Sequence, residues 1–123
     1  KIEFFNQKRK YNARCLNEAL REIPGLVLPQ EENHVFHQYT LRITSQSKKS
    51  RDEVKNDLEQ KGIMTAIFYP VPIHKQKAYP KYHHLQFPVT EQICNEVLSL
   101  PIHPSLSREE IDRICSALRK YLQ

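Results

Sequence analysis

Residues Ser50 to Pro72 read SRDEVKNDLEQKGIMTAIFYPVP, and this stretch contains a complete helix-to-strand transition. Ser50 followed by Glu53 forms a capping box, in which each side chain satisfies a backbone N–H group at the start of a helix. The helix is expected to end at Gly62, because glycine readily takes the left-handed conformation of a C-terminal cap. Ile63 to Tyr69 then carries the β-branched and aromatic residues typical of a strand. The stretch therefore predicts one helix followed by one strand.

Two prolines, Pro70 and Pro72, end that strand. Proline fixes φ and lacks an N–H group for a sheet ladder, so we expect a stiff, extended proline arm, Ile67 to Tyr79. Aromatic, imidazole and cationic side chains project from it: Tyr69, His74, Lys75, Lys77 and Tyr79. A pre-ordered segment of this chemistry suits a polar or anionic ligand, since little entropy is then lost on binding. A rigid surface connector is the simpler alternative, because most surface loops only join elements.

A long amphipathic helix is expected from the first residue to about Ile23, since apolar residues recur there at helical spacing. No capping residue precedes Lys1, and we therefore expect an excised segment of a longer protein. Pro24 and Gly25 predict a type II turn after this helix.

Two more helices are expected in the last third of the chain. The first begins at about Val89 and is predicted to bury Ile93, Cys94 and Val97. The second follows a further capping box, formed by Ser107 and Glu110.

Strands are predicted at Leu26 to Leu28, Val35 to Ile43, Ile63 to Tyr69 and Ser99 to His103. With the helices they predict a two-layer α/β (α+β) sandwich, in which a small sheet of about three to four strands has helices packed on one face. Residues 1–123 are expected to form a single domain. If the strands before and after the central helix are parallel neighbours, a right-handed crossover joins them; antiparallel placement with an intervening strand is the alternative.

The composition indicates where in the cell the protein is located and which kinds of partner it favours. The formal net charge of +5 favours anionic partners, but the basic residues are scattered as on an ordinary solvated surface. Cys15, Cys94 and Cys115 are widely spaced and lie on apolar stripes, so we expect reduced, buried thiols. The sequence has neither a signal peptide nor an apolar run of the roughly 20 residues that span a membrane. We therefore expect a cytoplasmic protein without a membrane partner.

The six histidines do not predict a metal site. On a strand, His34 and His37 would point to opposite faces, and the neighbours His83 and His84 would also diverge. No acidic or cysteine ligand lies beside them at a metal-binding interval.

One face of the strand from Val35 to Ile43 is polar, because it presents Gln38, Thr40 and Arg42. The guanidinium group of Arg42 suits a carboxylate or a phosphate of a ligand, which it would contact with two parallel hydrogen bonds. A partly exposed strand with a salt-bridged arginine is an equal alternative. The sequence has no glycine-rich phosphate loop and no nucleophile beside a base.

Three separated stretches occur in one order and together resemble a known family: FHQYTLRI, then the stretch from Ser50 to Tyr79, then FPVTEQICNEVLSLPIHPSLSREEI. They resemble the C-terminal small domain of DegT/DnrJ-type nucleotide-sugar aminotransferases. The resemblance extends over nearly the whole chain and includes the first helix.

The resemblance implies a fold-type I enzyme that uses pyridoxal 5'-phosphate to convert a keto group of a nucleotide-linked sugar to an amine. It also implies glutamate as amino donor, a homodimer, no nucleic-acid partner, and a role in the biosynthesis of polysaccharide or cell-surface sugars. In the family the Schiff-base lysine lies upstream, in a large domain absent from this chain. Pyridoxal chemistry needs that lysine, so we expect no catalytic residue here and no activity of the 123 residues alone.

The resemblance also assigns substrate-binding residues at the proline arm. Tyr69 and Pro70 match the family's Y-P pair, and His74 matches the histidine after the second proline. Phe68 stands where many members have histidine, which indicates contact by stacking or shape, not by hydrogen bonding. We therefore expect Phe68, Tyr69 and His74 to contact the sugar nucleotide.

Two other functions are compatible with a small basic α/β domain. One is a catalytically silent interaction domain that kept the fold. The other is a nucleotide- or RNA-binding module, which would stack bases on exposed aromatic residues. No RNA-recognition aromatic motif and no G-X-X-G clamp occurs in the sequence, which disfavours the RNA module.

Overall fold

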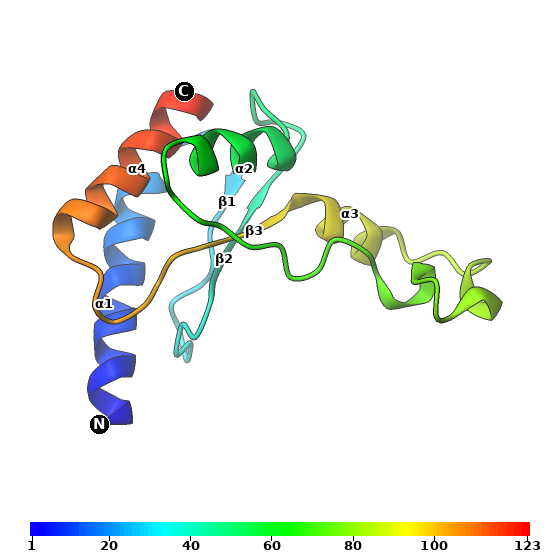
Figure 1. Ribbon diagram of the computed structural model, residues 1–123, viewed down its shortest axis with the longest axis horizontal. Helices are drawn as coiled ribbons and strands as arrows, with labels where there is room; N and C mark the ends of the chain where they lie inside the picture. The colour runs from blue at the N-terminus through cyan, green and yellow to red at the C-terminus, as the bar shows by residue number, and fades with distance from the viewer.

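Helix α1, Ile2–Leu20, is the longest element of the computed structural model, which describes residues 1–123. Its second half buries Ala13, Leu16 and Leu20 in the core. Its first turns extend beyond the rest of the molecule, and Phe4 at this end is exposed (Figure 1). The expected helix is confirmed, but its apolar stripe is covered only in the second half.

The turn after α1 has the predicted form. Gly25 has a φ of 79°, and the N–H group of Leu26 donates to the carbonyl oxygen of Ile23 at 3.3 Å. These are the features of a type II turn with glycine in its third position. The turn leads directly into strand β1, Leu26–Val27.

The sheet has three strands in the order β1-β2-β3, and both neighbouring pairs are antiparallel. Strand β2, Tyr39–Ile43, is central, and β3, Val97–Leu100, begins two residues before the predicted Ser99. The two strands of the predicted crossover are not neighbours, because β3 lies between β2 and Ala66, the one position of the second strand that pairs. Both pairings are antiparallel, so Ala66 runs parallel to β2. The intervening strand of the alternative is therefore confirmed, whereas its antiparallel placement is wrong. Strand β2 is also shorter than predicted, because Asn33 and Phe36 take positive φ angles of 56° and 52° and form a loop.

The strand predicted at Ile63 to Tyr69 is wrong except at one position. Ala66 and Ser99 exchange two backbone hydrogen bonds, of 3.1 and 2.7 Å, and form an isolated bridge beside β3. Pro70 and Pro72 have no N–H groups to continue the ladder, so the chain leaves the sheet edge shortly afterwards.

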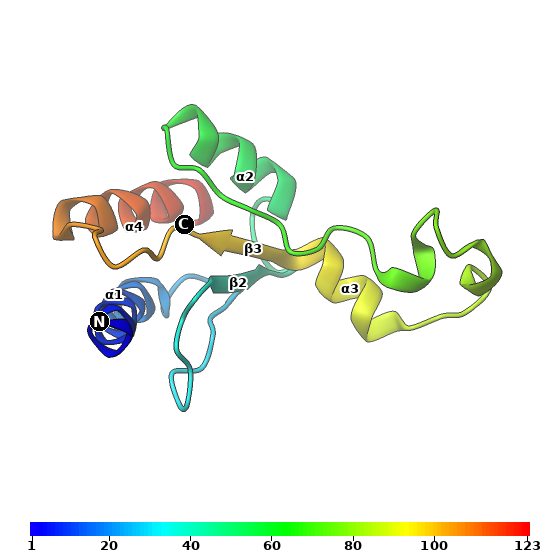
Figure 2. The same cartoon turned by 60° about the horizontal axis from the view of Figure 1, so that its bottom comes forward.

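Helices α1, α2 and α4 supply the helical part of the core. Helix α2, Arg51–Gln60, and helix α4, Arg108–Leu122, both begin with the predicted capping boxes, and both hydrogen bonds of each box are present. Figure 2 shows these three helices grouped beside β2 and β3. Their buried residues and those of the strands form one cluster, which includes Leu16, Leu20, Tyr39, Leu41, Val54, Leu58, Leu98, Ile111 and Leu118. The expected α+β fold is confirmed.

Helix α3, Pro88–Glu96, differs from the prediction. Ile93 and Cys94 are only half-buried, and the one buried residue of the helix is Glu96. Figures 1 and 2 show α3 extending away from the start of β3 toward the segment that precedes α3 in sequence. The apolar stripe of α3 therefore does not face the core.

The proline arm is not extended throughout, which corrects the expected polyproline geometry. Backbone bonds from Lys75 to Pro72 and from Tyr82 to Tyr79, of 2.9 and 3.0 Å, close two short 3₁₀ turns, Ile73–Lys75 and Pro80–Tyr82. Pro72, with φ −67° and ψ 151°, and Gln76, with φ −71° and ψ 144°, keep polyproline geometry on either side of the first turn.

All three cysteines are free thiols, and Cys15 and Cys115 are buried as predicted. Burial raises the pKa of Cys115 to about 11, which keeps this thiol protonated. None of the helices is long and apolar enough to cross a membrane.

Candidate functional site

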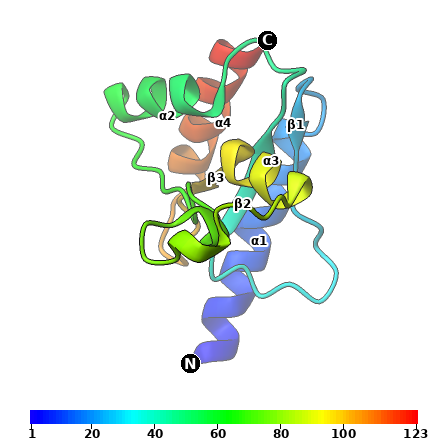
Figure 3. The same cartoon turned by 90° about the vertical axis from the view of Figure 1, so that its right-hand side faces the viewer.

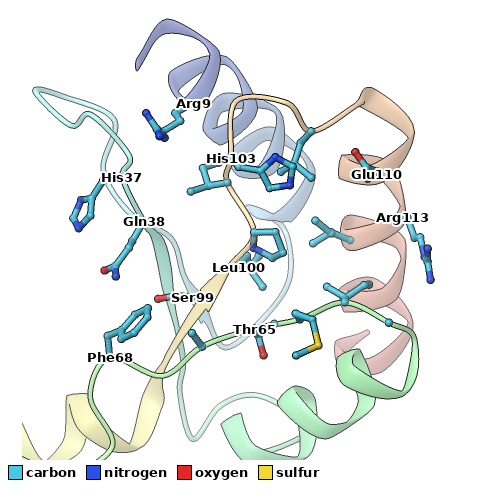
Figure 4. A pocket seen from close by; sticks show the side chains of 18 residues that line it. Arg9, His37, Gln38, Thr65, Phe68, Ser99, Leu100, His103, Glu110 and Arg113 are labelled. Carbon is cyan, nitrogen blue, oxygen red and sulfur yellow. The ribbon is translucent and has the colours of Figure 1, made fainter. Parts of the chain in front are cut away.

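A cavity of about 600 Å³ lies where the end of β3 meets the segment between α2 and the proline arm. The first helix contributes Arg9 to its wall, and α4 contributes Glu110 and Arg113 (Figure 4). The remaining wall is formed by the residues that follow β3 and by the loop before β2. Four regions distant in sequence therefore meet at this cavity.

The loop before β2 brings His37 and Gln38 to the cavity. Phe36 is buried, its ring stacks on His34 with centroids 4.1 Å apart, and its N–H group donates to His34 Nδ1 at 2.8 Å. These contacts hold Phe36 and the loop in a conformation that is otherwise unfavourable. The loop is thereby fixed, and His37 precedes β2 instead of lying within it as predicted.

Phe68 is the one predicted substrate contact that lines the cavity. Figure 4 shows its ring on the same side of the cavity as Gln38 and Ser99. Tyr69 does not line the cavity and is 70% exposed, while its ring meets the Phe68 ring edge-on at 5.7 Å. The two aromatic rings thus form an exposed surface that leads from the cavity along the first residues of the proline arm.

His74 is buried and points to α3, away from the cavity lining. Its Nε2 donates to Glu91 Oε1 at 2.8 Å, and the ring of Phe87 meets its imidazole edge-on at 4.8 Å. Hydrogen bonds from His74 and from the Phe87 N–H group, with the nearby charge of Lys75, lower the pKa of Glu91 against a smaller opposing effect of burial. His74 is therefore in contact with Glu91 and Phe87 and does not line the cavity.

Arg42 binds a carboxylate, but that carboxylate belongs to Glu96. Its Nε and Nη2 donate to Glu96 Oε2 at 2.9 and 2.6 Å, and Gln92 Nε2 donates to the other oxygen at 2.8 Å. Burial opposes ionisation of Glu96, yet these hydrogen bonds and the charge of Arg42 lower its pKa. The arrangement is the salt-bridged arginine that the sequence left open, and it joins β2 to the end of α3.

The sequence did not single out Arg9, Gln38, Ser99 or His103 as site residues, although they line the cavity. Gln38 directly precedes β2 and belongs to the polar face that the alternation had identified, so that pattern was a usable signal. Ser99 faces the same side, because its Oγ is hydrogen-bonded to Thr40 Oγ1 at 2.7 Å across the β2–β3 pair. Arg9 and His103 come from other elements, and no local pattern marks them.

The residues present do not fit a covalently held pyridoxal cofactor. Such a cofactor needs a lysine amine, and no lysine lines the cavity. No lysine of the chain is buried, and the three half-buried ones are engaged elsewhere. Lys49 pairs with Asp57, Lys55 pairs with Glu59, and Lys75 donates to two backbone carbonyl groups.

Residues 1–119 match the DegT/DnrJ/EryC1/StrS aminotransferase family, and the chain belongs to this family. The resemblance inferred from the sequence motifs is thereby confirmed.

Individual relatives agree with this placement. The chain is 39% identical over 119 residues to a dTDP-3-amino-3,6-dideoxy-alpha-D-galactopyranose transaminase of Aneurinibacillus thermoaerophilus, which covers 94% of this chain and 31% of that protein. It is 40% identical over 94 residues to a UDP-N-acetyl-3-dehydro-alpha-D-glucosamine 3-aminotransferase of Acidithiobacillus ferrooxidans, covering 76% of this chain and 24% of that protein.

Solved structures show the same fold. NtdA of Bacillus subtilis, determined with bound cofactor PMP, superposes with a TM-score of 0.84 at 30% identity, over 95% of this chain and 28% of that one. DesV of S. venezuelae superposes with a TM-score of 0.81 at 32% identity, over 95% and 32% of the two chains. The chain thus spans about a third of the length of the relatives that it matches.

Proposed function

We propose that this chain is the C-terminal small domain of a pyridoxal-phosphate-dependent aminotransferase that aminates a keto group of a nucleotide-linked sugar. The observation that carries the proposal is the family match over residues 1–119. Relatives that this chain matches are named as transaminases of dTDP- and UDP-linked sugars, and they support this substrate class.

The role of this chain would be to form one wall of the substrate cleft. Phe68 offers an aromatic surface against which the apolar side of a sugar ring can pack, and Tyr69 extends that surface. Arg9, His37 and Gln38 supply polar groups at the same cavity, suited to the hydroxyl or phosphate groups of such a substrate. Arg42 acts in this scheme as a structural partner of Glu96.

The catalytic lysine and the contacts to the cofactor would lie in a large domain outside these residues. When bound there, pyridoxal phosphate supplies the electron sink for amino transfer, and the present residues bind and orient the sugar. Glutamate as donor, a homodimeric and cytoplasmic enzyme, and a place in polysaccharide biosynthesis belong to the same proposal. The 123-residue chain alone would be inactive.

The test uses the complete protein, loaded with cofactor as judged by its visible absorbance, with a 3-keto nucleotide sugar and glutamate. Phe68→Ala should raise KM for the sugar about tenfold, since one apolar contact is typically worth that much discrimination. Val27→Ala serves as the control, because Val27 is an exposed apolar residue of β1 outside the cavity.

Two results would contradict the proposal at different points. A loaded protein without transaminase activity would refute the enzyme function and favour the silent interaction domain. An active protein in which Phe68→Ala and Tyr69→Ala leave kcat and KM unchanged would refute only the assignment of these residues.

A further inference from the structure

The segment Tyr69–Phe87, which we call the lobe, projects from the body of the molecule together with α3 (Figures 1 and 2), and Figure 3 shows it end-on next to α3. Most of its side chains are exposed, including Tyr69, Ile73, Tyr79 and Tyr82. His74 is its only buried residue. A segment with so little buried surface is held by specific polar contacts, so the partners of His74 decide how firmly the lobe is placed.

One carboxylate oxygen of α3 accepts hydrogen bonds from two residues of the lobe, one near its start and one at its end. Glu91 Oε1 accepts from His74 Nε2 at 2.8 Å and from the N–H group of Phe87 at 3.1 Å. Lys75 Nζ lies 4.0 Å from the same oxygen. Glu91 lies in the first turn of α3, where the helix dipole also favours a negative charge.

The lobe is braced internally around the same point. Lys75 Nζ donates to the carbonyl oxygens of His83 and Leu85, at 2.8 and 3.0 Å. The imidazole Nε2 of His83 is hydrogen-bonded to the carbonyl oxygen of Gln76 at 3.0 Å. The far loop of the lobe is therefore tied to the residues next to His74.

The other end of α3 is fixed to the sheet. Arg42 of β2 binds Glu96, and Arg51 Nη1 donates to the carbonyl oxygens of Cys94 and Val97, at 3.1 Å each. Helix α3 thus connects the sheet at its C-terminal end to the lobe at its N-terminal end. Displacement of the lobe relative to the cavity requires that one of these two attachments be broken.

We propose that Glu91 and His74 are positioning residues, which hold the lobe on α3 and so fix Phe68 at the cavity, and Tyr69 beside it, for the sugar nucleotide. This inference rests on the proposed function. Pro70 and Pro72 lie between Tyr69 and His74. Because proline restricts the backbone, the position of His74 limits the positions that Tyr69 can take. Release of the lobe adds conformations that substrate binding must then restrict, which weakens binding without changing the chemical step.

The first measurement is hydrogen exchange of the lobe amides in the complete protein, and it does not depend on activity. Glu91→Ala should accelerate exchange in residues 72–85 about tenfold or more, while the core strands keep their protection. His74→Phe should do the same, although it retains an aromatic ring beside Phe87. Glu109→Ala is the matched control, because Glu109 is an exposed acidic residue in the first turn of α4.

The second measurement is steady-state kinetics of the same variants. Glu91→Ala should raise KM for the nucleotide sugar about tenfold with kcat within about twofold of wild type. Glu91→Gln, which keeps an acceptor oxygen for the Phe87 N–H group, should recover part of the loss. A merely structural role would instead lower the amount of active enzyme and leave KM unchanged.

The outcomes separate this inference from the proposed function. Unchanged lobe exchange in Glu91→Ala and His74→Phe would overturn the inference, whatever the activity. Faster exchange with an unchanged KM would show an attachment without a positioning role, and would overturn it too. If the wild-type protein does not transaminate, the proposed function fails, while the exchange data still decide whether Glu91 and His74 hold the lobe.

Discussion

At the scale of single residues, the two glycines of the chain allow a matched comparison. Both have positive φ, of 79° at Gly25 and 72° at Gly62. A Cβ atom on Gly25 would lie 2.3 Å from the backbone nitrogen of Ser47, whereas one on Gly62 would meet only Arg113 Nη2, at 3.6 Å. The first position therefore combines backbone strain with a steric clash, and the second has the strain alone.

We expect Gly62→Ala to lower the free energy of unfolding by about 1 kcal/mol, the usual penalty of the left-handed conformation. Gly25→Ala should lower it by about 2 kcal/mol more, because the Ser47 backbone must move. Urea denaturation of both variants in one protein background measures the difference. Equal losses of unfolding free energy in the two variants would mean that the backbone at Ser47 moves without an energetic penalty.

Residue roles were predictable from the sequence where the partner is near in the chain. Ser50 and Glu53 are such a pair, since the capping box is a local pattern. Arg42 and His74 were recognised as functional groups, but their partners Glu96 and Glu91 could not be assigned. Many carboxylates can reach a guanidinium or an imidazole, and only the fold selects one of them.

At the scale of elements, the cap of α4 is the clearest determinant of a helix boundary. Ser107 Oγ accepts from the N–H group of Glu110 at 3.2 Å, and Glu110 Oε2 accepts from the N–H group of Ser107 at 2.8 Å. Ser107→Ala removes one of these bonds and should lower the free energy of unfolding by about 1 kcal/mol.

Ser116→Ala is the control for that substitution, because Ser116 is exposed in the interior of the same helix. Alanine is the better helix former there, so this variant should be as stable as wild type or slightly more stable. Thermal unfolding of the two variants measures the contrast. A similar decrease in Tm for both would refute the role of the cap.

The two elements that were predicted wrongly from the sequence are not fully covered by other elements in the structure. Ile63 to Tyr69 has the composition of a strand, but only Ala66 pairs with a neighbouring strand. Helix α3 has an apolar stripe, yet it extends beyond the core and leaves Ile93 half-buried. Periodicity reports which side of an element is apolar, and it does not report whether another element lies against that side.

At the scale of the whole molecule, the ion pair between Glu96 and Arg42 makes stability depend on pH. The pKa of Glu96 is lower in the folded protein than its ordinary value of about 4.3. Its contribution is therefore complete above that ordinary value and is lost as the pH falls through the lowered pKa. Glu53, Glu91 and Glu109 also have lowered pKa values and add to the same acid sensitivity.

Glu96→Gln should therefore lower stability at pH 7 and reduce the further loss between about pH 5 and pH 2, compared with wild type. Urea denaturation at several pH values measures both slopes. Glu18→Gln, on the exposed side of α1, is the control and should follow the wild-type curve. A Glu96→Gln slope equal to that of wild type would contradict a stabilising ion pair.

The α+β class was predictable at this scale, because it follows from the order of helices and strands. The direction of the strands stayed open, since a helix between two strands permits either arrangement. The cavity could not be predicted. Arg9, Gln38, Ser99 and Arg113 meet there only after α1, the loop before β2, β3 and α4 have packed together.

The bridge between Ala66 and Ser99 marks the two ends of a segment that can be exchanged as one unit. Its two backbone hydrogen bonds hold Ala66 next to Ser99, so the segment from Ile67 to Leu98 begins and ends at the same place in the structure. Up to Glu96, this excursion contributes no residue to the core cluster except the peripheral Ile67. Between Ile67 and Glu96, length and sequence can change without shifting the register of the sheet, which is set by residues from Val97 onward. Ala66 and Ser99 are therefore the splice points at which the lobe of another member of the family can be grafted onto this sheet.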